Sequence, residues 1–100
     1  MRRATTPTHT FTLPFDASMV SRFLLTYKQG AKIVLEKTEE DMTVDGNTWS
    51  VKLTQNETNR FTSASDVVVQ VRVLTPAGDA LVSDPMELRV RDVLNDEVLT

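Results

Sequence analysis

The chain has no cysteine among its 100 residues. Disulfide bonds and thiolate-bound metals are therefore excluded, and the fold must be held by side-chain packing and backbone hydrogen bonds. A chain of this length buries roughly two thirds of the surface that it exposes when unfolded, so a core forms without covalent cross-links. We expect a single domain over residues 1–100.

Long apolar runs are also missing. No stretch approaches the roughly 18 apolar residues that a membrane-spanning helix needs. Arg2 and Arg3 are followed by a polar segment, where a signal peptide would have about 7–15 apolar residues. We therefore expect a protein without a membrane partner that stays in the cytoplasm, or that leaves the cell by a route other than secretion.

The chain has a small net charge and few glycines. The 11 basic and 14 acidic residues give a net charge of −3, whereas nucleic-acid-binding domains are usually basic. We therefore expect no nucleic-acid partner. The three glycines, Gly30, Gly46 and Gly78, all stand at predicted turns, which leaves none for a phosphate-binding loop.

The strongest pattern that is present is alternation with a period of two. Valines at 67, 69, 71 and 73 are separated by Val68, Gln70 and Arg72. The same alternation recurs in residues 86–90 and around the single tryptophan, Trp49. Alternation of this kind predicts strands with one buried face.

Further strands follow from the same pattern and from turn residues. Strands are predicted at residues 11–13, 19–28, 31–37, 42–44, 47–53, 66–74, 80–83 and 86–93. Helical spacing competes in 19–28, but the β-branched and aromatic content favours a strand. In 31–37 we expect Ile33 and Leu35 to face the core. The Asp84–Pro85 pair interrupts the strand that begins at residue 80. After this pair the strand continues or forms again.

One segment is expected to be helical. Thr54 and Glu57 have the spacing of a capping box, which predicts one or two helical turns over residues 55–60. With turn signals every 8–12 residues, the whole pattern indicates an all-β fold. We predict an immunoglobulin-like β-sandwich of about seven antiparallel strands with this short helical crossover. Residues 1–7 form an extended lead-in and 94–100 a C-terminal tail; a small barrel is the alternative.

The residues that carry chemistry form no recognisable site. His9 is the only histidine and has no partner at useful spacing, so we expect an exposed or edge histidine. No serine stands in a Gly-x-Ser-x-Gly elbow; the serines considered are Ser21, Ser50, Ser63, Ser65 and Ser83. We expect solvent to leave the pKa values of Asp92 and Asp96 unchanged near the chain end.

Two weaker patterns remain. Arg72, Arg89 and Arg91 would share an outward face if the last strands pair, although no aromatic side chain accompanies them. Residues 56–58 match the N-glycosylation pattern, which is a coincidence in a protein that is not secreted. We therefore predict no catalytic, cofactor-binding or metal-binding residue, no cofactor, and no small-molecule substrate.

The order of these segments resembles a known family. The segments that carry the resemblance are Arg2–Arg3 with Thr6–Pro14, Gly30–Lys37, Val51–Thr58, the valine-rich strand, Val82–Pro85 and Val90–Leu94. Together they resemble small proteins encoded among the virion genes, in the tail or baseplate region, of phages and prophages of Gram-positive gut bacteria. The resemblance spans almost the whole chain, and its motifs are structural.

The resemblance implies a non-enzymatic structural or interaction module of a phage tail or virion. Its partners would be other phage structural proteins, or further copies of the chain joined through a sheet edge. The implied locations are the cytoplasm of the bacterial host during expression and the virion. A small phage-encoded inhibitor of a host defence protein or nucleotide signal is the alternative. An enzyme would need a pocket with convergent polar groups.

Overall fold

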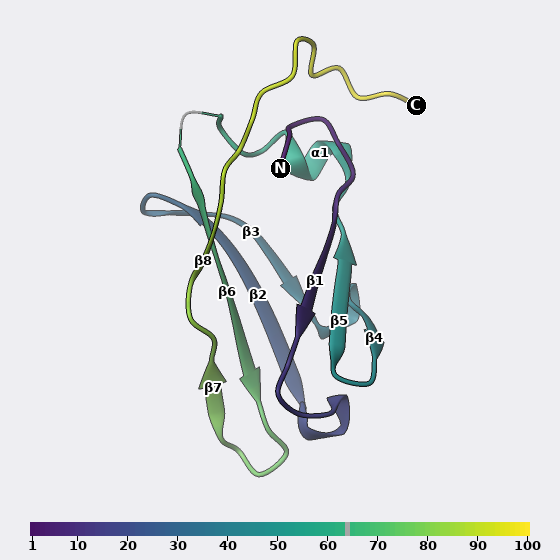
Figure 1. The fold of residues 1–100 in the computed structure, drawn as a ribbon, viewed down its shortest axis with the longest axis vertical. Coiled ribbons are helices and arrows are strands. Elements are labelled where there is room, and N and C mark those ends of the chain that lie inside the picture. The colour runs from purple at the N-terminus through teal and green to yellow at the C-terminus, as the bar shows by residue number, and fades with distance from the viewer. Residues whose placement is uncertain (64) are drawn as a thin grey trace.

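The computed structural model describes residues 1–63 and 65–100 and is all-β, with two antiparallel sheets (Figure 1). One sheet has the strand order β1–β5–β4; the other has the order β3–β2–β6–β7, and β8 also pairs with β6. The strands are β1 (Thr8–Thr12), β2 (Arg22–Gln29), β3 (Lys32–Thr38), β4 (Thr43–Asp45), β5 (Thr48–Lys52), β6 (Val67–Leu74), β7 (Ala80–Val82) and β8 (Met86–Leu88).

The core lies between the two sheets. Phe23 on β2 and Trp49 on β5 stack with ring centroids 4.4 Å apart, which joins an interior strand of one sheet to the middle strand of the other. Tyr27 packs edge-on against Phe61, with ring centroids 5.8 Å apart. Within the described residues the indole N–H of Trp49 has no hydrogen-bond partner, so this side chain stabilises the fold through buried apolar area.

Strand β2 is the centre of the wider sheet because it pairs with both β3 and β6. Phe23, Leu25 and Tyr27 face the core, as alternation requires. The prediction of a strand rather than a helix is confirmed. The strand begins later than residue 19, however, because residues 17–19 form a 3-10 turn that the Asp16 side chain caps by accepting from the amide of Ser18 at 3.0 Å.

The predicted inward orientation of Ile33 is wrong. Leu35 is buried as expected, but Ile33 is 51% exposed. The pairing of β2 with β3 shifts between Tyr27 and Lys28: Tyr27 stands opposite Leu35, whereas Lys28 stands opposite Ile33. One residue of β3 is thus left out of the register, and such a bulge turns the following side chain to the other face of the sheet.

The predicted helical segment is confirmed as α1 (Gln55–Thr58). Its capping box is complete: the amide of Glu57 donates to the Thr54 hydroxyl at 3.1 Å, and the amide of Thr54 donates to the Glu57 carboxylate at 2.9 Å. The same carboxylate pairs with Lys37 on β3, and both side chains are largely buried. Glu57 therefore fixes both the start of the helix and its place beside the wider sheet.

The last predicted strand is shorter than expected. Strands β7 and β8 line the same edge of β6 on either side of the Asp84–Pro85 interruption. Ser83 bridges the break, because its amide donates to Val71 and its hydroxyl accepts from Val71, at 2.8 and 3.0 Å. β8 ends at Leu88, and the chain beyond it bonds to the N-terminus instead.

The two ends of the chain are joined. The amide of Arg3 donates to the Arg91 carbonyl at 3.0 Å, and the Arg3 guanidinium contacts Asp92 at 2.9 Å and Asp96 at 3.1 Å. The amide of Val93 and the Arg3 guanidinium hold the pKa of Asp92 below its usual range, so the expectation of an unchanged pKa for Asp92 is wrong. The lead-in also contains a turn, where Ala4 has a φ of 58°.

Neighbouring valines on β6 give a test of which face is buried. Val69 is 1% exposed and Val68 is 37% exposed, and threonine has the same branched shape as valine. We predict that Val69→Thr lowers the free energy of unfolding by about 1–3 kcal/mol, because the threonine hydroxyl would be buried among apolar side chains without a hydrogen-bond partner. The matched control Val68→Thr should change it by less than about 0.5 kcal/mol.

Urea unfolding followed by tryptophan fluorescence measures both variants. Equal losses at the two positions would contradict the assignment of the faces of β6.

Candidate functional site

Among residues 1–63 and 65–100, strand β1 has a partner strand, β5, on one edge only. Its pairing with β5 begins at Pro7, whose carbonyl accepts from the Leu53 amide at 2.9 Å. The pairing ends at Leu13, whose amide donates to the Asn47 carbonyl at 2.8 Å. Backbone groups of successive residues point to opposite sides of a strand. The N–H and C=O groups of the three even-numbered threonines therefore point away from β5; these are Thr8, Thr10 and Thr12.

The free edge of β1 carries no charge. No Asp, Glu, Lys or Arg occurs between Arg3 and Asp16. The other edge strands are protected in ways typical of soluble proteins. β3 carries charged residues such as Lys32 and Glu36, the β7–β8 edge is broken by Asp84–Pro85, and β4 has only three residues. Among the edges in the described residues, β1 is thus the one best suited to pair with another strand.

A groove runs between β1 and the β7–β8 edge. Its two sections have volumes of about 260 and 280 Å³. The first section is lined by Thr8, His9, Thr10, Phe11, Val69, Met86 and Leu88. The second section is lined by Leu13, Pro14, Phe15, Val71, Val73, Leu81, Val82 and Ser83. We call these two sections together the β1–β8 groove.

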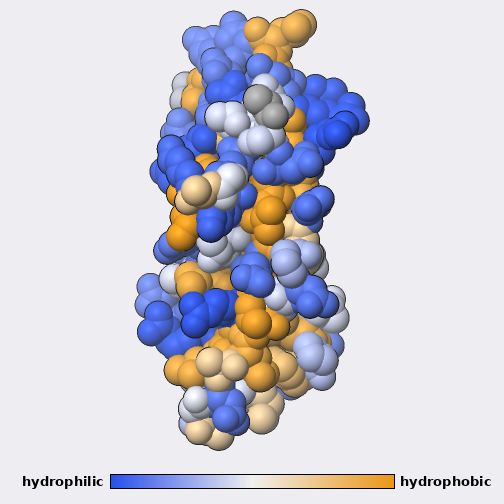
Figure 2. All heavy atoms as spheres, turned by 90° about the vertical axis from the view of Figure 1, so that its left-hand side faces the viewer, coloured by the Kyte–Doolittle hydropathy of each residue, from blue (hydrophilic) through white to orange (hydrophobic). Residues whose placement is uncertain are grey.

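The β1–β8 groove is apolar and uncharged. Its floor is the core-facing side of β6, and its far rim includes Leu81, Val82 and Met86, which are 45%, 61% and 37% exposed. Figure 2, viewed from the β7–β8 side, shows apolar side chains in a broken band down the length of the molecule. The band exists because the three-stranded sheet is narrower than the sheet that it covers.

His9 stands at the groove and joins the two sheets. Its side chain shares the inner face of β1 with Phe11, and its Nδ1 atom lies 2.6 Å from the Tyr27 hydroxyl on β2. Burial raises the pKa of Tyr27, and the charge of Glu57 raises it further. Tyr27 therefore keeps its proton, and the tautomer of neutral His9 decides which of the two groups donates the hydrogen bond.

Of the two expected alternatives, an exposed or an edge histidine, the structure shows the edge position but not full exposure. His9 is on an edge strand but is half-buried, and burial is the main cause that lowers its pKa, followed by repulsion from the N-terminal ammonium. The hydrogen bond between neutral His9 and protonated Tyr27 links the two sheets. Within the described residues no group of three or more acidic, cysteine or histidine side chains is arranged to hold a metal.

Two of the serines, Ser21 and Ser50, form hydrogen bonds with structural roles. Ser21 donates to the Leu74 carbonyl at 2.9 Å, and Ser50 lies 3.2 Å from the Thr10 hydroxyl on the outer face. Neither contact involves His9. Thr58, the last residue of the glycosylation pattern, is buried and donates to the Thr5 carbonyl at 2.9 Å.

The three arginines for which we expected a shared outward face do not form one basic cluster. The last strand does pair with β6, but antiparallel, so Leu88 stands opposite Val67 and Arg89 comes to lie 3.9 Å from Asp66. Arg72 lies six residues further along β6 than Asp66, which is roughly 20 Å at the rise of a strand. Arg72 and Arg89 are therefore at opposite ends of the sheet.

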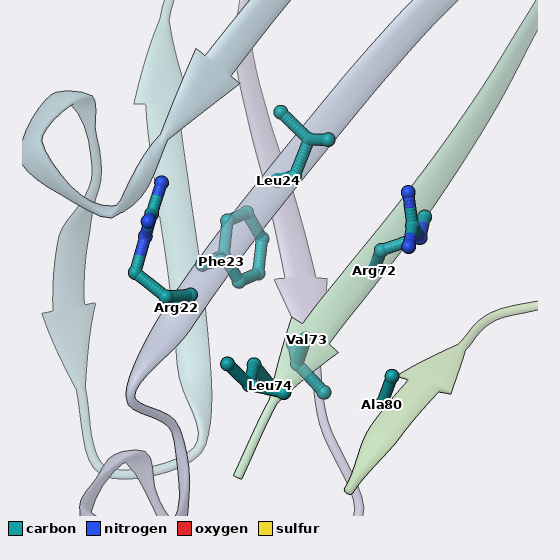
Figure 3. Close-up of a pocket in the computed structure, with 7 residues that line it drawn as sticks. All are labelled: Arg22, Phe23, Leu24, Arg72, Val73, Leu74 and Ala80. Carbon is teal, nitrogen blue, oxygen red and sulfur yellow. The ribbon is translucent and has the colours of Figure 1, made fainter. Parts of the chain in front are cut away.

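Arg72 instead lies near Arg22 in a shallow hollow on the outer face of the wider sheet. Figure 3 shows the two arginines on either side of Leu24 and Leu74. Arg22 pairs with Glu39 at 2.7 Å, so part of the positive charge is already balanced. Alternation of charged and aliphatic side chains across strands is typical of a solvated sheet face.

Sequence reasoning missed the β1–β8 groove. Finding it requires the pairing of the strands, which alternation does not give. One signal was present: the uncharged run from residue 4 to residue 15 contains a strand bounded by Pro7 and Pro14. Such a strand lacks the charges that normally protect an edge.

Comparison of this chain with protein-family models, with curated proteins and with solved structures finds no match. In the part of the chain that the structure describes, no helix is long and apolar enough to cross a membrane.

The His9–Tyr27 link predicts a pH dependence of stability. Because the pKa of His9 in the folded protein lies below its ordinary value of 6.5, the unfolded chain binds more protons just below that pH. The free energy of unfolding should therefore fall as pH drops from about 7 to 5, by at most about 1.4 kcal/mol per pH unit for one group.

His9→Asn is the control, since its side-chain amide stands where Nδ1 stood and still bonds to the Tyr27 hydroxyl, but does not titrate. Urea unfolding at pH 5, 6 and 7 should show this loss in the parent chain and not in the variant. The carboxyl groups with lowered pKa values lose their contribution only at lower pH, because their ordinary values are 3.8 and 4.5. Identical profiles would contradict the assignment.

Proposed function

We propose that this chain is a non-enzymatic structural module of a phage or prophage virion that joins other proteins through an open sheet edge. The observation that carries the proposal is the free, uncharged edge of β1 beside the apolar β1–β8 groove. Unpaired backbone groups next to exposed apolar side chains are what strand-mediated association requires. The phage assignment rests on the resemblance of the sequence.

The strand order supports an immunoglobulin-like assignment of the domain. Immunoglobulin domains place strands A, B, E and D in one sheet, and G, F and C, with C′ in some, in the other. Here β1, β5 and β4 take the places of B, E and D, while β3, β2, β6 and the β7–β8 edge take those of C′, C, F and G. In this correspondence the place of strand A, beside β1, is vacant.

A rigid two-sheet domain with an open edge suits an assembled particle. Its backbone groups and apolar side chains bind neighbours through shape and hydrogen bonds, and no reactive group is needed. Arg3 near the N-terminus pairs with Asp92 and Asp96 near the C-terminus, and neither terminal segment lines the groove.

Phage particles purified from a strain that carries the gene provide the test. We expect mass spectrometry to find the chain in density-gradient fractions in a constant ratio to the tail proteins. An abundant host cytoplasmic protein, absent from the same fractions, is the control.

Recovery of the chain only from the soluble fraction would contradict the virion assignment. Its co-purification from that fraction with a host defence protein or a nucleotide would instead support the inhibitor alternative.

A further inference from the structure

We propose that the β1–β8 groove binds one extended, uncharged segment of another protein as an added strand, antiparallel to β1, with apolar side chains at alternate positions. The inference rests on the proposed function and specifies the partner. It makes the vacant place beside β1 a binding site for a peptide strand, on the same sheet as β5 and β4.

Backbone hydrogen bonding sets the register of the added strand. The outward N–H and C=O groups of Thr8, Thr10 and Thr12 would each exchange two hydrogen bonds with the residue opposite. Pro7 and Pro14 flank this segment, and a proline cannot donate to a ladder. The site therefore accepts a segment of about six or seven residues.

Side-chain directions set the pattern of the added strand. His9, Phe11 and Leu13 lie on the inner face of β1, and residues directly opposite in a sheet share a face. The residues opposite these three therefore enter the groove and contact Val69, Met86 and their neighbours on the floor and rim. The intervening residues lie on the outer face beside the threonines.

The chemistry of the lining selects an uncharged segment. No Asp, Glu, Lys or Arg lines either section of the groove. A charged side chain placed there would be removed from water without a partner, which strongly disfavours binding. Valine, isoleucine or threonine would fit, because branched side chains suit a half-buried strand.

The occupant is a single strand rather than the β1 edge of a second copy. The wider sheet continues past β1, so β6 and β8 lie beneath the vacant place and line the groove. If two β1 edges paired about a two-fold axis, the two wide sheets would occupy the same space. A single peptide strand avoids this overlap, because it carries no second sheet packed beneath it.

A tethered strand tests the proposal. A seven-residue strand that alternates threonine with three valines is fused to Met1 through a Gly-Ser linker of about eight residues, which is long enough to reach the groove. Tethering gives an effective concentration of about a millimolar. We expect the valine strand to raise the thermal midpoint of unfolding by about 5 °C or more. The matched control replaces the three valines with aspartate and should give no rise.

Thr10→Pro removes one outward N–H of β1 and the side-chain contact with Ser50, but no backbone hydrogen bond to β5. In this background the gain from the valine strand, measured against the same variant without the strand, should fall by more than half. Amide hydrogen exchange provides a second readout: the tethered strand should slow exchange at Thr8, Thr10 and Thr12, whereas His9 and Phe11 are already protected by β5.

Equal midpoints for the valine and aspartate strands would overturn the proposal, and so would a gain that survives Thr10→Pro or protection on β3 or β4 instead of β1. These outcomes are independent of the virion experiment. The chain can therefore be a virion protein that does not bind a strand, or bind a strand without being a virion protein.

Discussion

The packing of the three-stranded sheet on β2 is the contact on which the rest of the structure depends. Phe23 and Tyr27 rise from β2 toward β5 and β1, where they meet Trp49 and His9. Because the narrow sheet is centred on β2 and β3 lies on one side of it, the other side of the wider sheet is left partly uncovered. The β1–β8 groove is thus a consequence of how the core is built.

His9 has a particular position in this arrangement. It lines the groove and holds β1 to β2 through a hydrogen bond of 2.6 Å. An apolar side chain there would add to the exposed apolar surface, whereas a charged one would be costly to bury. A neutral histidine bonded to a tyrosine satisfies both demands, and its lowered pKa follows from the same burial.

Local patterns in the sequence predicted most elements but not their arrangement. Alternation located β6 and the core position of Trp49, and the Thr54–Glu57 spacing located α1, because each depends on residues close together in the chain. Ile33 was assigned to the wrong face because a bulge in the pairing with β2 reverses its direction. The joined termini and the groove depend on pairs distant in sequence, such as Arg3 with Asp92 and β1 with β8, which no periodicity records.

An open edge in a folded protein needs an explanation, because unprotected edges promote aggregation. Here the edge is short, it is bounded by Pro7 and Pro14, and its outer face carries hydroxyl groups at Thr8, Thr10 and Thr12. These features limit the length of any strand that can pair and keep the outer face polar, so extended sheet growth is disfavoured. They place no charge on the inner side, where a lysine would block the groove. The edge is thus restricted in length but not closed, a combination that suits binding to a short, defined strand.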